Sequence, residues 1–287
     1  MPLAVVTDST AYLPPELVRA HRLTVVPLTV VLNGAEGLEG IETRPDDATR
    51  ALGGRRVSVS TSRPAPEQFG RTYRRLLAEG ADGVVSVHLS AELSGTVEGA
   101  RAAAADLDGR VAVVDSRSAG MGIGFPVLAA AGAAARGADL AGVRDAALAA
   151  VDRTRVLFYV DTLEFLRRGG RINAAEALLG TALSVKPIMH MVDGAIVLRE
   201  KVRTASRGVA RLVDLAAEAA GDDQVDLAVH HLAAPRRAEQ LLDALRVRLG
   251  DRLHDTYLTE AGAVVAAHAG PGLASVVVHR RARETSP

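Results

Sequence analysis

Three short polar segments of this chain stand where apolar runs end, and their residue types suit the binding of one anionic group. They are Thr61-Ser62, Leu93-Ser94-Gly95-Thr96 and His268-Ala269-Gly270-Pro271-Gly272. Hydroxyl groups and imidazole nitrogens can donate hydrogen bonds to a carboxylate, and the free amides at a helix N-terminus also favour an anion. If the three segments converge in the fold, they form a polar socket for the acidic end of an otherwise apolar molecule.

Each of these segments also has a structural interpretation. Ser62 and Ser94 precede predicted helices, where serine is a common N-terminal cap. His268 follows an apolar stretch predicted to be a strand, Val264 to Ala267, and a lone histidine there is more often structural than a ligand contact. Asp8-Ser9-Thr10, after the first predicted strand, either lines a crevice at the strand ends or caps the next helix.

The same residues allow a second chemistry, the hydrolysis of an acyl ester. Ser94 as nucleophile, His268 as base and Asp161 or Asp193 as the orienting carboxylate occur in the order found in α/β hydrolases. The G-x-S-x-G elbow of those enzymes is missing, because neither glycine position around Ser94 holds glycine. A serine hydrolase therefore remains the alternative to a binding protein.

Two glycine-containing segments complete the candidates. Gly120 to Gly124 has the spacing G-x-G-x-G, which only loosely resembles a dinucleotide-binding loop and keeps a nucleotide-dependent oxidoreductase as a third hypothesis beside a plain turn. Arg167-Arg168-Gly169-Gly170-Arg171 is typical of a helix end, although its arginines could also neutralise a ligand. The histidines and carboxylates lack metal-ligand spacing, so we expect neither a metal nor a cofactor.

The composition narrows the class of protein. The chain has 287 residues, of which 48% are hydrophobic and 24% charged, which is enough for a sizeable core. Its 34 basic residues balance 34 acidic ones, and such neutrality argues against a nucleic-acid partner. Cysteine is absent, which fits a reducing cytoplasm. We find no apolar stretch long enough to span a membrane, and we expect a cytoplasmic protein.

The elements that must position these residues follow an α/β pattern in the first half. Predicted strands cover Leu3 to Val6, Leu23 to Leu32, Val57 to Ser60, Val84 to Val87 and Val111 to Val114. Apolar residues at helical spacing predict helices over Glu67 to Leu77, Val97 to Leu107, Pro126 to Ala135 and Leu140 to Val151. Strands that alternate with helices indicate a mostly parallel, Rossmann-like sheet.

A second α/β domain is expected after Arg153, so that the domains cover residues 1–153 and 154–287. Its predicted strands are Val156 to Val160, Val225 to Val229, Val264 to Ala267 and Ser275 to His279. Its predicted helices cover Thr162 to Arg168, Val209 to Ala216 and Ala238 to Leu249. Met189 to Leu198 is predicted to be a hairpin, because Asp193-Gly194 is a favoured two-residue turn.

Six segments in this order give the chain, over nearly its whole length, a resemblance to the DegV family of bacterial fatty-acid-binding proteins. They are Val6-Thr7-Asp8-Ser9-Thr10, Thr61-Ser62-Arg63-Pro64, Leu93-Ser94-Gly95-Thr96, Val114-Asp115-Ser116, Gly169-Gly170-Arg171-Ile172 and His268-Ala269-Gly270-Pro271-Gly272. The chain departs from the common family pattern at Arg63 and Ala65, where glutamine and serine are frequent.

The resemblance implies a two-domain α/β fold that holds one long-chain fatty acid between its domains, without catalysis by the chain itself. It implies that the hydroxyls of the first two polar segments and the histidine of the third hold the carboxylate, with Arg171 near the head group or a partner surface. The expected ligand-binding residues are Thr61, Ser62, Ser94, Gly95, Thr96, His268 and Arg171. Some family members present their fatty acid to a fatty acid kinase, which is therefore an expected partner.

The energetics agree with this expectation. A buried carboxylate without partners costs several kcal/mol, so it needs roughly two to four donors. Each buried methylene contributes about 0.8 kcal/mol, so a chain as long as palmitate yields on the order of 10 kcal/mol before the cost of ordering it. Aliphatic walls are sufficient for that part of the ligand.

Overall fold

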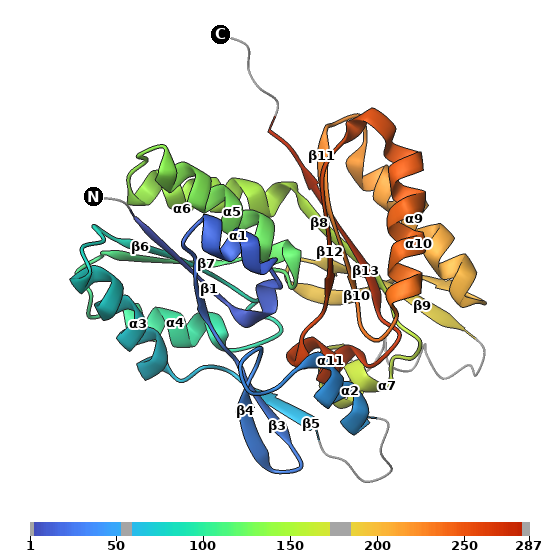
Figure 1. Cartoon of the computed structure of the whole chain (residues 1–287), viewed down its shortest axis with the longest axis horizontal. Coiled ribbons are helices and arrows are strands. Elements are labelled where there is room, and N and C mark those ends of the chain that lie inside the picture. The colour runs from blue at the N-terminus through green and yellow to red at the C-terminus, as the bar shows by residue number, and fades with distance from the viewer. Residues whose placement is uncertain (1–2, 53–58, 173–184, 283–287) are drawn as a thin grey trace.

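The computed structural model describes residues 3–52, 59–172 and 185–282, and it confirms the predicted α/β architecture. The described strands form three sheets, with the strand orders β2-β1-β6-β7, β10-β9-β8-β13-β11-β12 and β4-β3-β5 (Figure 1). The predicted boundary at residue 153 falls where helix α6 ends and strand β8 begins. The division of the chain into two domains at this point stays a prediction.

The four-stranded sheet is parallel throughout, as expected of a Rossmann-like sheet. Its strands are β1 (Ala4–Asp8), β2 (Thr24–Val26), β6 (Val84–His88) and β7 (Val111–Asp115). One face is covered by α3 (Pro66–Ala78) and α4 (Thr96–Ala104), and the other by α5 (Met121–Ala135) and α6 (Leu140–Arg153), with α1 (Pro15–Ala20) beside them (Figure 1). The carboxyl ends of β1, β6 and β7 all point toward the second half of the chain.

The six-stranded sheet is mixed, and only its β11 and β12 are parallel neighbours. Its strands are β8 (Thr154–Tyr159), β9 (Lys186–Val192), β10 (Ala195–Val202), β11 (Val225–His231), β12 (Leu253–Glu260) and β13 (Ala274–Arg280). Two helices, α9 (Ala205–Ala220) and α10 (Pro235–Leu249), cover one face, and α7 (Glu164–Arg168) follows β8. Strand β12 was not predicted, because most of its residues are polar or charged.

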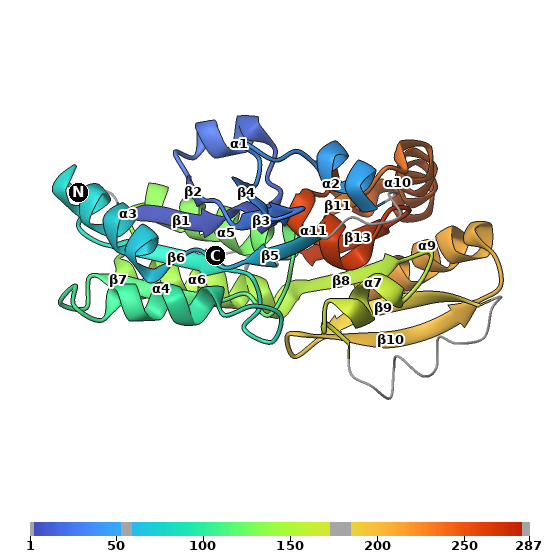
Figure 2. The ribbon, with the colours of Figure 1, turned by 90° about the horizontal axis from the view of Figure 1, so that it is seen from below.

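A small antiparallel sheet lies at the junction of the two larger ones, near helix α11 (Ala263–Ala269) (Figure 2). It consists of β3 (Thr29–Leu32), β4 (Ala35–Leu38) and β5 (Val59–Ser62), and α2 (Pro45–Leu52) lies between β4 and β5 in the chain. The single strand predicted over Leu23 to Leu32 was wrong, because it divides into β2 and β3 at Pro27, which has no amide to pair. Of the strand predicted at Val57 to Ser60, residues 57–58 lie outside the described residues.

Helix α11 (Ala263–Ala269) corrects a second prediction, since Val264 to Ala267 was expected to be a strand. A short apolar run does not distinguish a buried strand from a buried helix by periodicity. Here both sides of the segment are covered, because Val264 and Ala266 are buried and α11 packs on α2, α7 and β5. His268 therefore lies in the last turn of a helix.

Helix α5 explains how the two larger sheets share one core. It contacts β1 and β6 of the parallel sheet and also β8 and β13 of the mixed sheet. A helix covered on both sides is apolar all round, and ten of its residues are buried. Phe125 of α5 stacks on His279 of β13, with the ring centroids 5.0 Å apart. One continuous cluster of buried side chains accordingly contains Val5 and Val85 as well as Phe158 and Val277.

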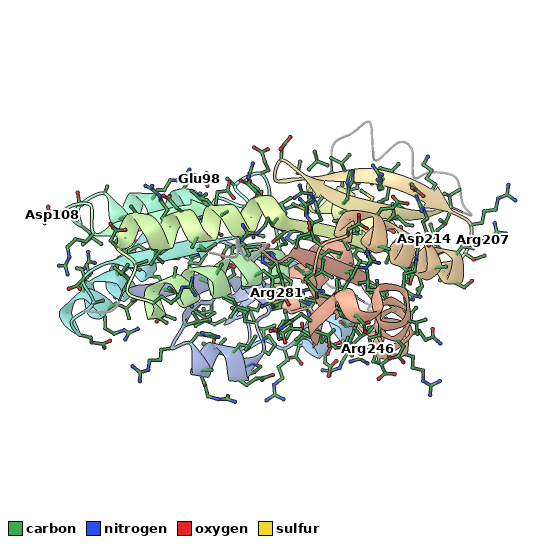
Figure 3. All side chains as sticks on the ribbon, turned by 90° about the horizontal axis from the view of Figure 1, so that it is seen from above. Glu98, Asp108, Arg207, Asp214, Arg246 and Arg281 are labelled. Carbon is green, nitrogen blue, oxygen red and sulfur yellow. The ribbon has the colours of Figure 1, made fainter. Side chains whose placement is uncertain are left out.

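Local sequence features account for a turn, a helix cap and the charged outer faces of several helices. The hairpin of β9 and β10 turns at Asp193 and Gly194, whose φ angles of 48° and 89° are the positive values that this turn requires. Asp139 caps α6 by accepting a hydrogen bond from the Gly142 amide at 2.8 Å. Charged side chains such as Glu98 and Arg246 project from the outer faces of their helices (Figure 3). No helix within the described ranges is long and apolar enough to span a membrane.

Candidate functional site

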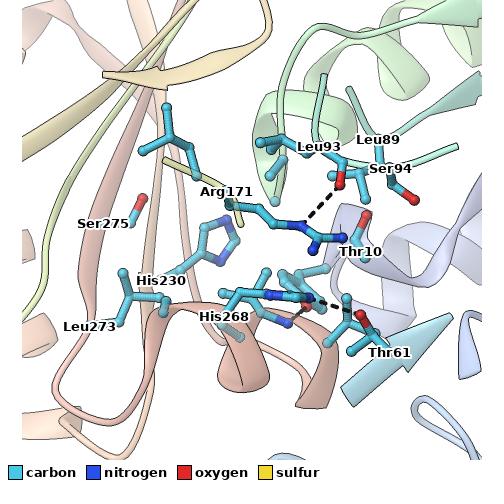
Figure 4. A pocket seen from close by; sticks show the side chains of 18 of the residues that line it. Thr10, Thr61, Leu89, Leu93, Ser94, Arg171, His230, His268, Leu273 and Ser275 are labelled. Carbon is cyan, nitrogen blue, oxygen red and sulfur yellow. Dashed lines mark hydrogen bonds between the residues drawn. The ribbon is translucent and has the colours of Figure 1, made fainter. Parts of the chain in front are cut away.

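A cavity of about 940 Å³, including its open mouth, lies beside the carboxyl ends of β1 and β6, where open α/β sheets bind ligands (Figure 4). Helix α11 and the mixed sheet form its other walls. Most of its lining is aliphatic or aromatic, namely Tyr12, Leu28, Leu89, Leu93, Ala119, Val156, Phe158, Leu166, Met191, Ile196, Ala261, Val264, Val265, Ala269 and Leu273. The polar groups predicted from the sequence gather at one end of this apolar cavity.

Thr61 and His268 meet at this polar end. Thr61 Oγ1 lies 2.8 Å from His268 Nε2, although the two residues are 207 positions apart in the chain (Figure 4). Thr61 is the third residue of β5 and pairs with Val30, so Thr61 and Ser62 belong to the strand and not to a loop after it. Both residues line the cavity, Ser62 as an exposed side chain at the mouth.

Ser94 also lines the cavity, and its Oγ lies 2.9 Å from Oγ1 of Thr96. Thr96 is completely buried as the first residue of α4, and it stands behind Ser94, outside the lining of the cavity. Gly95 does not line the cavity either, but its carbonyl oxygen accepts a hydrogen bond from Arg63 at 3.3 Å. Of the three predicted residues in this segment, the structure therefore brings Ser94 alone to the cavity surface.

Arg171 supplies the positive charge of the site. Its half-buried guanidinium donates from Nε to the Leu93 carbonyl oxygen at 3.2 Å and from Nη1 to the Gly169 carbonyl oxygen. No carboxylate within the described part of the chain forms an ion pair with it, and burial lowers its pKa. Arg63 is exposed at the same end, and the described residues that line the cavity include no aspartate or glutamate. The polar end is therefore complementary to an anion.

His268 is neutral at physiological pH. Burial, and to a smaller extent the charge of Arg171, lower its pKa to about 4. Its Nδ1 is buried without a hydrogen-bond partner in the described residues, and it faces Gly169, where a Cβ would lie only 2.3 Å away. The imidazole thus packs tightly against the end of α7, and Nε2 is the ring nitrogen that forms the hydrogen bond with Thr61.

Glu39 and Tyr12 position the helix that carries His268, and the sequence analysis missed both. Glu39 is 4% exposed, and its Oε1 accepts a hydrogen bond from the Val264 amide at 2.8 Å, in the first turn of α11. The Tyr12 hydroxyl donates to the same carboxylate oxygen and accepts from the Val265 amide, both at 3.2 Å. A Cβ on Gly262 would collide with both side chains. No local signal marks Glu39, since its partner on α11, Val264, lies 225 positions away and Tyr12 lies 27 positions away.

The triad required for the hydrolase alternative is not assembled. His268 Nε2 contacts Thr61, whereas the Ser94 hydroxyl forms its hydrogen bond with Thr96. No carboxylate in the described ranges contacts a ring nitrogen of His268, and Asp161 instead accepts a hydrogen bond from Tyr159 at 2.6 Å.

The Gly120 to Gly124 segment forms the beginning of α5 and not a dinucleotide loop. The amide of Met121, in the first turn, donates to Nε2 of His230 at 2.9 Å and is therefore not free for a phosphate. A Cβ on Gly122 would lie 1.9 Å from Ser118 Oγ. These glycines allow close packing.

One group of metal-ligand residue types was not visible in the sequence. Single ligand atoms of Asp226, His254 and Asp255 lie within 4.8 Å of one another. However, Nη1 of Arg281 lies 2.9 Å from both Asp226 Oδ1 and His254 Nδ1. The Arg281 guanidinium lies where a metal ion would bind, so these side chains form an ion-pair network.

Fold and site together define an α/β protein with an amphipathic cavity, which is polar and cationic at its mouth and mostly apolar inside. A sequence model described as "Uncharacterised protein, DegV family" matches residues 2–281. A DegV domain-containing protein of Streptomyces coelicolor is 52% identical over 283 residues, which cover 97% of this chain and 99% of that protein. The chain belongs to the DegV family.

Solved structures agree with this assignment. A DegV family protein from Thermus thermophilus, described by its fatty acid binding, matches with a TM-score of 0.91 and 33% identity, covering 98% of this chain and 100% of that one. DegV of Bacillus subtilis, described as a fatty acid binding protein, matches with a TM-score of 0.88 and 30% identity, covering 98% and 100%.

Proposed function

We propose that this protein binds a long-chain fatty acid such as palmitate, with the carboxylate at the polar end of the cavity and the chain along its apolar walls. One observation carries the proposal: Arg171 and the hydroxyls of Thr61 and Ser94 gather at one end of a mostly apolar cavity, and the described part of its lining contains no acidic residue. The fatty acid binding of the Thermus and Bacillus relatives supports the same ligand class.

The hydrogen-bond geometry supports a relay of donors toward the carboxylate. A carboxylate only accepts hydrogen bonds, so Thr61 must donate its proton to the ligand and accept one from His268. This requires the neutral His268 tautomer that is protonated on Nε2 and leaves Nδ1 as an unpaired acceptor. Buried acceptors without a partner are tolerated more readily than buried N–H groups. His268 then acts on the ligand through Thr61.

Ser94 and Thr96 repeat this arrangement on the other side of the head group. If the buried Thr96 hydroxyl donates to Ser94 Oγ, the Ser94 proton is free for the ligand. Two oriented hydroxyls and the guanidinium of Arg171 then supply about three donors, which is the number a desolvated carboxylate needs. Gly95 and Thr96 support the site from behind and do not touch the ligand.

We further propose that the chain is a non-catalytic carrier in the cytoplasm that presents the carboxylate to a fatty acid kinase. The open mouth of the cavity supports this proposal, because Arg63 and Ser62 are exposed beside the head-group position. Formation of an acyl phosphate from the palmitate-loaded protein and such a kinase would test it. An unchanged product level after removal of the DegV chain would contradict it.

The binding proposal is tested by native mass spectrometry of the purified and then delipidated protein, followed by titration with palmitate. We expect one fatty acid per chain and a loss of affinity in Arg171→Gln and Ser94→Ala. Arg168→Gln is the matched control, because Arg168 is exposed on the same segment and pairs with Glu164 at 2.6 Å. Failure to bind palmitate would refute the proposal. Hydrolysis of a nitrophenyl acyl ester that Ser94→Ala abolishes would favour the hydrolase instead.

A further inference from the structure

One polar side chain of the cavity is unexplained by the head-group site. Ser275 lies on β13 and lines the cavity, yet it is only 6% exposed. Its hydroxyl forms no hydrogen bond to any residue that the structure describes, and it faces the open space of the cavity. A hydroxyl in this position can bond to water or to a polar group of the ligand.

The position of Ser275 in its strand directs the side chain toward the cavity. Side chains alternate between the two faces of a strand, and Val276 and Val278 belong to the cluster beneath α9 and α10, whereas Val277 belongs to the cluster around α5. Ser275 therefore shares the face of Val277. In Figure 4 it lies with Leu273 and His230, across the cavity from Thr61 and Ser94.

The cross-strand neighbours of Ser275 do not satisfy its hydroxyl. They are Phe158 on β8, which is apolar, and His230 on β11. His230 Nε2 accepts the Met121 amide at 2.9 Å, so the neutral imidazole carries its proton on Nδ1 and donates it to Thr259 Oγ1 at 2.8 Å. Both nitrogens are engaged.

The other polar groups on the inner walls are also engaged. Thr10 Oγ1 donates to the Asp8 carboxylate at 2.5 Å. The Tyr12 hydroxyl donates to Glu39 and accepts from the Val265 amide. Ser275 thus offers a hydroxyl, free both to donate and to accept, in a wall that is otherwise apolar or already paired.

We infer that Ser275 forms a second polar subsite, which receives a neutral oxygen substituent, such as a hydroxyl group, carried along the acyl chain of the ligand. This inference rests on the proposed fatty-acid site and specifies its substrate class. An unsubstituted chain leaves the Ser275 hydroxyl unpaired, whereas a hydroxylated chain satisfies it. No charged side chain lies beside Ser275 on its neighbouring strands, so the substituent is uncharged.

The inference is tested by measuring the affinity of the delipidated protein for palmitate and for a set of palmitates that each carry one hydroxyl at a different carbon. We expect one position, or two adjacent ones, to bind about tenfold more tightly than the other hydroxylated isomers, which corresponds to about 1.4 kcal/mol. Ser275→Ala should abolish that preference, with the variant still binding palmitate. Ser275→Thr, which keeps a hydroxyl at this position, should retain the preference.

Val276→Ala is the matched control, because Val276 is the next residue of β13 but faces α9 and α10. It should retain the positional preference even if it loosens the strand. Palmitate binding with no preferred hydroxyl position, or an equal preference in Ser275→Ala, would overturn the inference and leave the fatty-acid site intact. Absence of binding by palmitate and all isomers would instead refute the proposed function itself.

Discussion

The hydrogen bond between Thr61 and His268 joins β5 to α11, and Thr61→Val tests whether it serves the ligand. Valine has the shape of threonine and favours strands equally, so the change removes only the hydroxyl 2.8 Å from Nε2. His268 would then have no partner on either nitrogen. Loss of one donor to a buried carboxylate costs about 1 to 3 kcal/mol, so we expect palmitate affinity to fall about 5- to 150-fold.

The assay is a palmitate titration of delipidated protein near neutral pH, with urea unfolding of the same samples to separate binding from stability. Thr61→Ser keeps the hydroxyl and should bind within about twofold of the natural protein. If His268 acts through Thr61, the effects of Thr61→Val and His268→Ala should not add in the double variant. Unchanged palmitate affinity in Thr61→Val, or full additivity, would refute the relay.

Three further results are expected from the structure. Burial lowers the pKa of His230, His268 and His279 to about 4, from ordinary values of 6.5. The unfolded chain therefore binds more protons than the folded one, and stability should fall as pH drops across this interval. A urea midpoint that does not change with pH would contradict this. Asp8→Asn replaces a buried carboxylate that accepts hydrogen bonds from His88 and the Leu89 amide, and should destabilise the fold by about 1 to 3 kcal/mol in urea unfolding. Gly262→Ala should displace α11, because the added Cβ would collide with Glu39 and Tyr12, and should therefore weaken palmitate binding. An affinity equal to that of the natural protein would disprove this.

The sequence determined most of the scaffold, because its signals are local. The alternation of apolar strands with amphipathic helices predicted the parallel sheet, and Asp193-Gly194 predicted the hairpin of β9 and β10. These features depend on periodicity and on φ preferences within a few residues. Two strand predictions from apolar runs failed. Pro27 divides the run from Leu23 to Leu32, and the run from Val264 to Ala267 forms a helix that other elements cover on both sides.

The sequence also identified the residue types of the site, since Thr61, Ser62, Ser94, Arg171 and His268 all line one cavity. Their convergence was expected from the resemblance to the DegV family and could not follow from spacing alone. Which group bonds to which was decided only by the fold, because such contacts join segments that are distant in the chain. Thr61 meets His268 across 207 positions, and Glu39 holds α11 across 225. Hydrogen bonds of this kind depend on how packed elements meet in space, and no local pattern encodes that.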